Sequence, residues 1–154
     1  MQKGLPEAQG LYSPENEHDN CGIGFVAHIK GKKSHDIVTR GLEVLARMDH
    51  RGATGADAKT GDGAGIQIQV PHDFFVKLGI AVPQAGQYGT GLLFLPKLRK
   101  EADLFISTLK KFCLEEELDL FHIREVPVDS KAPGEIALRT EPRVIQVFIK
   151  SIVR

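Results

Sequence analysis

The sequence has 154 residues, which is enough for one domain with a hydrophobic core. Hydrophobic residues make up 42% and charged residues 26%, a composition typical of globular proteins and unlike that of disordered chains. Lys plus Arg and Asp plus Glu number 20 each, so no overall charge favours nucleic acid or an anionic membrane as a partner.

Targeting and redox signals point to one compartment. No apolar run approaches the roughly 20 residues that cross a bilayer. The first 20 residues contain no apolar stretch of signal-peptide length and no arginine. The only two cysteines, Cys21 and Cys113, cannot build a disulfide framework or a four-thiolate metal site. These features predict a cytoplasmic protein.

In chain order, residues 1–20 are polar and aperiodic, which predicts a leader or extended arm. Residues 21–29 alternate, which predicts a half-buried strand with Cys21, Ile23, Phe25, Ala27 and Ile29 on one face. Ser34 is expected to cap a helix over 35–49. The further elements expected are a glycine-rich loop at 50–65, a strand at 66–70, a helix at 71–79 opened by Pro71, a strand at 88–96, a helix at 99–118, and strands at 120–128 and 143–153.

The expected strands outnumber the helices and do not alternate with them strictly, which favours an α+β layered fold over a doubly wound one. The last strand, 143–153, is apolar on successive residues, as in strands covered on both faces. No further segment follows to cover it, so we expect an incomplete domain whose open strand recruits other chains.

Several ligand classes are disfavoured by spacing. "GDGAG" precedes a strand and lacks the dinucleotide fingerprint, and "GKKS" lacks the upstream glycine of a phosphate loop. A calcium loop starting at Asp57 would have Ile68 at its twelfth position instead of glutamate. The six histidines show no metal-ligand spacing. We therefore expect no metal and no cofactor in this chain.

Three residues are weighed as site candidates. Cys113 lies on the apolar face of the 99–118 helix, which predicts a buried core thiol. Cys21 could also be a core thiol, but it follows a polar leader directly and precedes Gly22 and Gly24. Cleavage after Asn20 would place a thiol and a free α-amine on one residue, and such an amine can act as general base for its own side chain. Arg51, in "HRGA", is either a loop arginine that binds carbonyls or a site residue.

Four segments carry a family resemblance. "GLYSPENEHDNCGIGFVAHIKG", "LARMDHRGATGADAKTGDGAGIQIQVPHDFF", "YGTGLLFLP" and "VPVDSKAPGEIALRTEPRVIQVFI" resemble the start of the large subunit of bacterial glutamate synthases, in the same order. Together they cover nearly the whole chain. The combination of "DNCG", "HRGA" and "KTGDGAG" is specific, whereas each short glycine motif alone is not.

The resemblance implies a class II glutamine amidotransferase domain of the N-terminal nucleophile type, with a four-layer α/β/β/α sandwich. It implies that residues 1–20 are a propeptide, that residues 21–154 are the N-terminal portion of the domain, and that Cys21 attacks the side-chain amide of glutamine. The ammonia released would serve glutamate formation from 2-oxoglutarate in a synthase domain holding FMN and a 3Fe–4S cluster. Arg51 matches a position that shapes the glutamine site.

One departure limits what the chain should do alone. The family's oxyanion hole uses an Asn-Gly pair, yet asparagine occurs here only as Asn16 and Asn20, and neither precedes glycine. We therefore expect the isolated chain to be inactive and to need the remainder of the large subunit, with a small reductase subunit as a further candidate partner. The alternative is a non-catalytic, stand-alone fragment that docks on a partner subunit and completes or regulates it.

Overall fold

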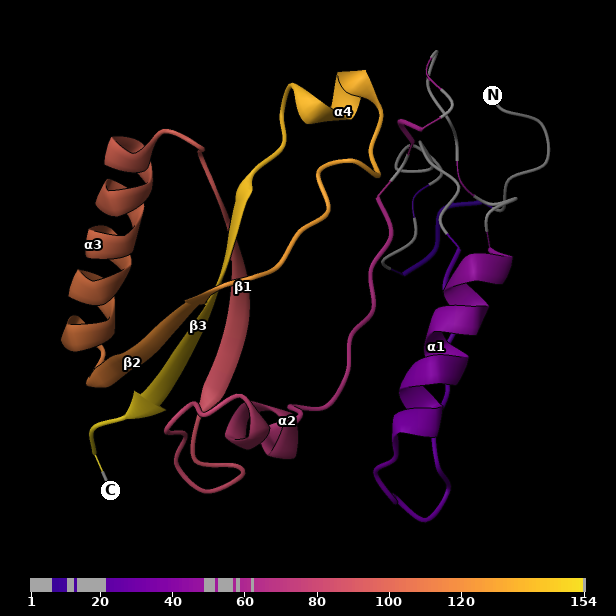
Figure 1. Cartoon of the computed structure of the whole chain (residues 1–154). Helices are drawn as coiled ribbons and strands as arrows, with labels where there is room; N and C mark the ends of the chain where they lie inside the picture. The colour runs from indigo at the N-terminus through magenta and orange to yellow at the C-terminus, as the bar shows by residue number, and fades with distance from the viewer. Residues whose placement is uncertain are drawn as a thin grey trace. The chain divides into compact units, whose positions relative to one another are not determined.

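The computed structural model describes residues 7–10, 13, 22–48, 52, 57, 59–61 and 63–153. The chain divides into two compact units, Met1–Gln67 and Ile68–Arg154, which are considered separately below. The first unit contains helix α1 (His35–Arg47). The second contains, in order, α2 (His72–Lys77), β1 (Gly89–Leu95), α3 (Arg99–Glu115), β2 (Leu118–Glu125), α4 (Glu135–Leu138) and β3 (Arg143–Ser151) (Figure 1).

The second unit is built on a three-stranded antiparallel sheet in the order β1-β3-β2 (Figure 1). The last strand in the sequence, β3, is therefore the central one. Its residue Val147 pairs with Gly91 on one side and with Ile123 on the other. All backbone donors and acceptors in the middle of β3 can thus be used in the sheet, whereas β1 and β2 each present one edge.

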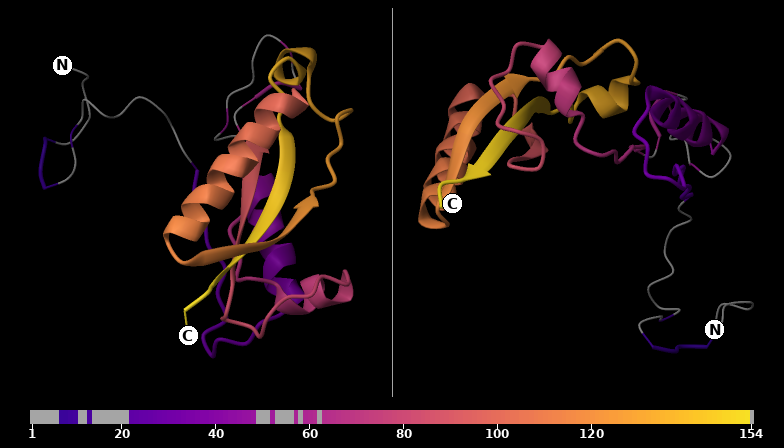
Figure 2. Two further views of the ribbon diagram at one scale, coloured as in Figure 1. Left: turned by 90° about the vertical axis from the view of Figure 1, so that its left-hand side faces the viewer. Right: turned by 90° about the horizontal axis from the view of Figure 1, so that it is seen from below.

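Helix α3 lies along one face of this sheet (Figure 2). Ala102 on the helix is fully buried and packs with Ile145 and Val147 of β3 and Leu95 of β1. The helix ends at Glu115, and Glu117 then adopts a positive φ of 56°, which reverses the chain into β2. The helix was expected to reach residue 118, so its last turn is shorter than the sequence pattern predicted.

An aromatic cluster covers part of the opposite face. Phe148 of β3 is fully buried and meets Phe75 of α2 edge-to-face, with ring centroids 4.8 Å apart. Tyr88 joins this cluster and shares a hydrogen bond of 3.1 Å with Nδ1 of His72. Burial raises the pKa of the Tyr88 hydroxyl.

The prediction that β3 lacks cover is therefore wrong. Residues 145–148 are all buried, because α3 packs on one side and the aromatic cluster on the other. Phe75 belongs to α2, which precedes all three strands in the sequence, so the cover on this face comes from upstream of β3. Strands also do not outnumber helices among the described residues, which contain four helices and three strands. The α+β class itself is confirmed.

Two predicted strands are absent. Residues 22–28 and 63–70 form no strand, although both have alternating apolar residues. Ile23 and Phe25 are 95% and 93% exposed, and the side expected to be buried therefore faces outward. Alternation makes a segment suitable for a ladder, but the ladder needs a hydrogen-bonded neighbour. Ser34 does occupy the N-cap of α1 with an extended backbone, but its side chain makes no capping hydrogen bond.

A polar cluster fastens the connection between β2 and β3 to the start of α3. The carboxylate of Glu141 accepts hydrogen bonds from Nζ of Lys97 and from the hydroxyl of Ser130. Only 16% of the Glu141 side chain is exposed, against 61% for Lys97. The bond from Lys97, followed by that from Ser130, lowers the pKa of Glu141 below its ordinary value near 4.5.

Because folding lowers the pKa of Glu141, its carboxylate should stabilise the fold fully at neutral pH and lose that contribution in acid. We expect Glu141→Gln to lower the free energy of unfolding above about pH 5.5, and the difference from the parent to shrink as pH falls below about 4.5. Urea unfolding across this range measures it. In a Lys97→Met background the effect of Glu141→Gln should be smaller at neutral pH. A loss of unfolding free energy in Glu141→Gln that is equal at pH 3 and pH 7 would contradict the lowered pKa of Glu141.

Candidate functional site

The two sequence-predicted site residues, Cys21 and Arg51, lie outside the described residues. Their immediate neighbours along the chain are described, namely Gly22 onward on one side and Gly52 on the other. The surroundings of the candidate site are therefore described from three parts of the chain: the segment that follows Cys21, the helix α1 and the described parts of the glycine-rich loop. All of these belong to the first unit.

The segment after Cys21 comes close to α1 at Gly24. Val26 is half-buried, while Ile23 and Phe25 are exposed. A Cβ placed on Gly24 would lie 2.6 Å from Cγ1 of Val44 on α1. Real Cβ atoms essentially never approach another heavy atom so closely, so only glycine fits this position without a shift. The close neighbour of Gly24 is thus a side chain of α1 and not another stretch of backbone.

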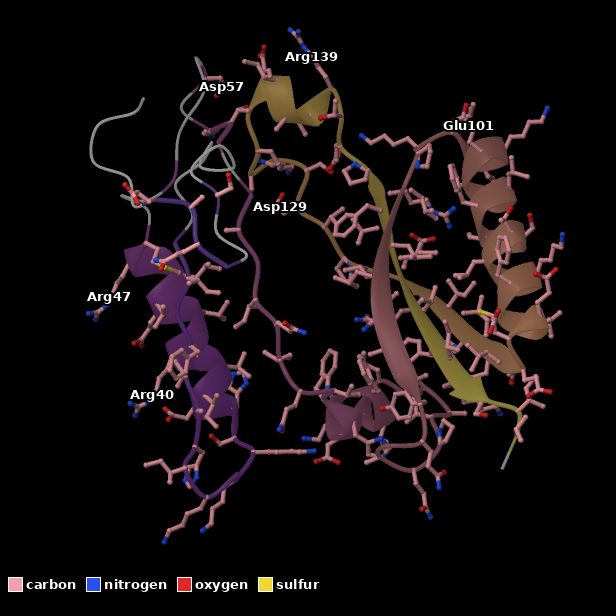
Figure 3. The ribbon with its side chains drawn as sticks, turned by 180° about the vertical axis from the view of Figure 1, so that it is seen from behind. Arg40, Arg47, Asp57, Glu101, Asp129 and Arg139 are labelled. Atoms are coloured by element: carbon pink, nitrogen blue, oxygen red, sulfur yellow. The ribbon has the colours of Figure 1, made fainter. Side chains whose placement is uncertain are left out.

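Helix α1 turns its apolar side toward this segment and toward residue 66. A Cβ on Gly41 would lie 3.0 Å from Cδ1 of Ile66, so Gly41 also admits a close neighbour. None of the α1 residues is buried. On the other side of the helix, Arg40 and Arg47 point away from it (Figure 3), and Arg40 pairs with Asp36 one turn earlier at 2.7 Å. The helix therefore packs on one side against residues 24 and 66 and presents charged side chains on the other side.

In the glycine-rich loop, Asp57 forms a compact turn. Its carboxylate accepts hydrogen bonds from the backbone N–H of Lys59 and from the hydroxyl of Thr60, each at 2.9 Å. The N–H of Thr60 also donates to the Asp57 carbonyl at 2.9 Å. The carboxylate thus holds the loop itself, as in Asx turns. The part of the chain that the structure describes has no cluster of three possible metal ligands.

Cys113 and Gln146 are both buried in the second unit. Cys113 is 4% exposed, which confirms the prediction of a buried thiol on α3. Gln146, on the central strand, accepts a hydrogen bond of 2.8 Å from Nε of Arg124 on β2. None of the helices in the described part of the chain has both the length and the apolar character that a membrane crossing requires. The burial of Cys113 and the bond between Arg124 and Gln146 belong to the packing of the second unit.

Comparison with known families defines the class of protein. The family model for glutamine amidotransferases class-II matches residues 21–153, and so nearly all of this chain. The chain belongs to this family.

Its relatives narrow the class further. The chain is 44% identical over 147 residues to the large chain of glutamate synthase [NADPH] from Bacillus subtilis, and 42% identical over 149 residues to glutamate synthase [NADH] from Schizosaccharomyces pombe. It is 41% identical over 152 residues to ferredoxin-dependent glutamate synthase from Pyropia yezoensis. These matches cover 92–96% of the chain but only 7–10% of the relatives. The resemblance to glutamate synthase large chains is confirmed, and the chain spans about a tenth of their length or less.

The close contact between Gly24 and Val44 is the feature of this region that sequence reasoning missed. Two signals for it were present, since Gly24 interrupts an otherwise apolar strand pattern and Val44 sits on the apolar side of a predicted helix. Neither signal says which helical residue meets which glycine. That pairing depends on how the segment lies on α1, which the structure alone provides.

Proposed function

We propose that this chain is the glutamine-hydrolysing portion of a glutamate synthase large subunit, with Cys21 as the nucleophile. The observation that carries the proposal is that the class-II amidotransferase match begins at residue 21, the cysteine. Residues 1–20 are then a propeptide, and maturation places Cys21 at the N-terminus. The fold built by residues 21–154 is proposed to be the first half of a four-layer α/β/β/α sandwich.

A terminal cysteine combines a nucleophile with its own base. An α-amine titrates near 7.7–8.0 and a thiol near 8.5, so close to neutral pH the amine can accept the thiol proton. The sulfur attacks the side-chain carbonyl carbon of glutamine, the C–N bond breaks, and the nitrogen leaves as ammonia with that proton. Water then adds to the glutamyl thioester, the C–S bond breaks, and glutamate and the thiol are released. Arg51 is proposed to help bind glutamine.

The rest of the reaction belongs to other parts of the full-length protein. Ammonia would be consumed there with 2-oxoglutarate, in a domain that holds FMN and a 3Fe–4S cluster. The residues of this chain do not fit such a cluster, because iron–sulfur clusters are held by several cysteine thiolates. The chain has only two cysteines, and one of them, Cys113, is buried on α3. We therefore derive no step through either cofactor. The relatives named above are glutamate synthases of the NADPH, NADH and ferredoxin-dependent kinds.

The test is covalent labelling of the full-length protein that carries this sequence. An electrophilic glutamine analogue should attach to one cysteine, and peptide mapping by mass spectrometry should place it on a terminal peptide that begins with Cys21. Cys113 is the matched thiol in the same chain and should stay unlabelled, because it is buried. Labelling that requires residues 1–20 to remain attached would overturn the terminal-amine mechanism, and labelling only elsewhere would overturn the role of Cys21.

A further inference from the structure

A tight glycine contact lies three positions after Cys21. A Cβ on Gly24 would meet Cγ1 of Val44 at 2.6 Å, whereas ordinary van der Waals contact begins at 3.4 Å. An added methyl group would therefore have to displace one of the two partners by roughly 0.8 Å. At the described glycines Gly63, Gly65, Gly89 and Gly91, by contrast, the same Cβ has nothing within 4 Å.

Val44 is poorly able to move away. It lies within α1, three residues before the helix ends at Arg47. Valine in a helix has one strongly preferred χ1 rotamer, because its two γ carbons crowd the preceding turn. The neighbouring residues Val44 and Leu45 are half-buried, so the helix backbone is also held by packing. The partner that yields is then the segment that carries Gly24. Its residues 22–28 belong to no strand, so no ladder of hydrogen bonds holds them in place.

We infer that Gly24 and Val44 are positioning residues for the nucleophile. Their contact fixes the position of the segment after Cys21 on α1. Cys21 is three residues from Gly24, and so no more than about 10 Å of chain separates it from this contact. Attack on an amide is sensitive to errors of about 1 Å in the placement of the nucleophile. A displacement of the segment at Gly24 should therefore lower the rate of glutamine hydrolysis without removing any group that reacts. This inference rests on the proposed function of Cys21.

The experiment adds a methyl group at residue 24 and then removes the side-chain atoms that it meets at residue 44, both in the full-length protein. Gly24→Ala should lower kcat for glutamine-dependent glutamate formation by at least about tenfold, with KM for glutamine changed less than kcat. Synthesis from added ammonia should be unchanged, because it does not use the nucleophile. Val44→Ala removes Cγ1, the atom in the way, so the double variant Gly24→Ala/Val44→Ala should recover to within about threefold of the parent.

Controls separate positioning from stability. Gly89→Ala makes the same change on β1 in open space, so it should leave both activities intact. Should Gly24→Ala not fold, the double variant decides: an active double variant supports the contact, and an inactive one overturns it. Parent-like kcat in Gly24→Ala, an equal loss of ammonia-dependent activity, or failure of Val44→Ala to rescue would each overturn the inference. None of these outcomes touches the proposed function, which fails separately if Cys21→Ser retains glutamine-dependent activity.

Discussion

Cys21→Ser is expected to abolish glutamine-dependent glutamate formation by the full-length protein, by at least about a thousand-fold, and to leave ammonia-dependent synthesis largely intact. Serine keeps the shape of the side chain but replaces the thiol with a hydroxyl, a far weaker nucleophile near neutral pH. Removal of a nucleophile is among the largest single effects seen in enzymes that form covalent intermediates. The two rates, measured on one preparation, separate loss of nitrogen delivery from loss of the whole enzyme.

Cys113→Ser is the matched control for this prediction. It makes the same exchange of thiol for hydroxyl, but at a site that is 4% exposed on α3. A hydroxyl buried there without a partner should cost about 1–3 kcal/mol of stability, while the rate with glutamine stays near that of the parent. If folded Cys113→Ser were as inactive as Cys21→Ser, the assignment of the two thiols would be wrong.

Phe148→Ala is expected to have the largest effect on stability, about 3–5 kcal/mol. Phe148 is fully buried in the central strand and packs edge-to-face on Phe75. It also faces Tyr88, with ring centroids 6.3 Å apart, so its removal would open a cavity shared by three segments. Urea unfolding should show a large fall in midpoint with little change in slope.

Phe94→Ala provides the matched comparison in the same sheet. Phe94 lies on the edge strand β1, and 67% of it is exposed. Its loss should change stability by no more than about 1 kcal/mol, because little contact is removed. Equal effects of Phe94→Ala and Phe148→Ala would show that the aromatic cluster is not part of the stable core.

The regular elements of the second unit could largely be predicted from the sequence. The expected ranges 88–96, 120–128 and 143–153 correspond to β1, β2 and β3, and the long helical pattern corresponds to α3. Burial within α3 was predicted less well. Cys113 is buried as expected, and Ala102 is buried too, but two other apolar residues of the helix, Phe105 and Phe112, are each 56% exposed. A helical period identifies an apolar side, but the width of the surface it packs on decides how much of that side is covered.

By itself, the sequence determined the family, the α+β class, the position of most helices and strands, and the burial of Cys113. These follow from local patterns and from motifs, which need no knowledge of distant contacts. Only the tertiary structure decided that β3 is central and covered on both faces, that the alternating segments at 22–29 and 66–70 form no strand, and that Gly24 meets Val44. The reason is that a ladder, a covered face and a close contact each require a partner from elsewhere in the chain, and a local pattern shows that a partner is needed without naming it.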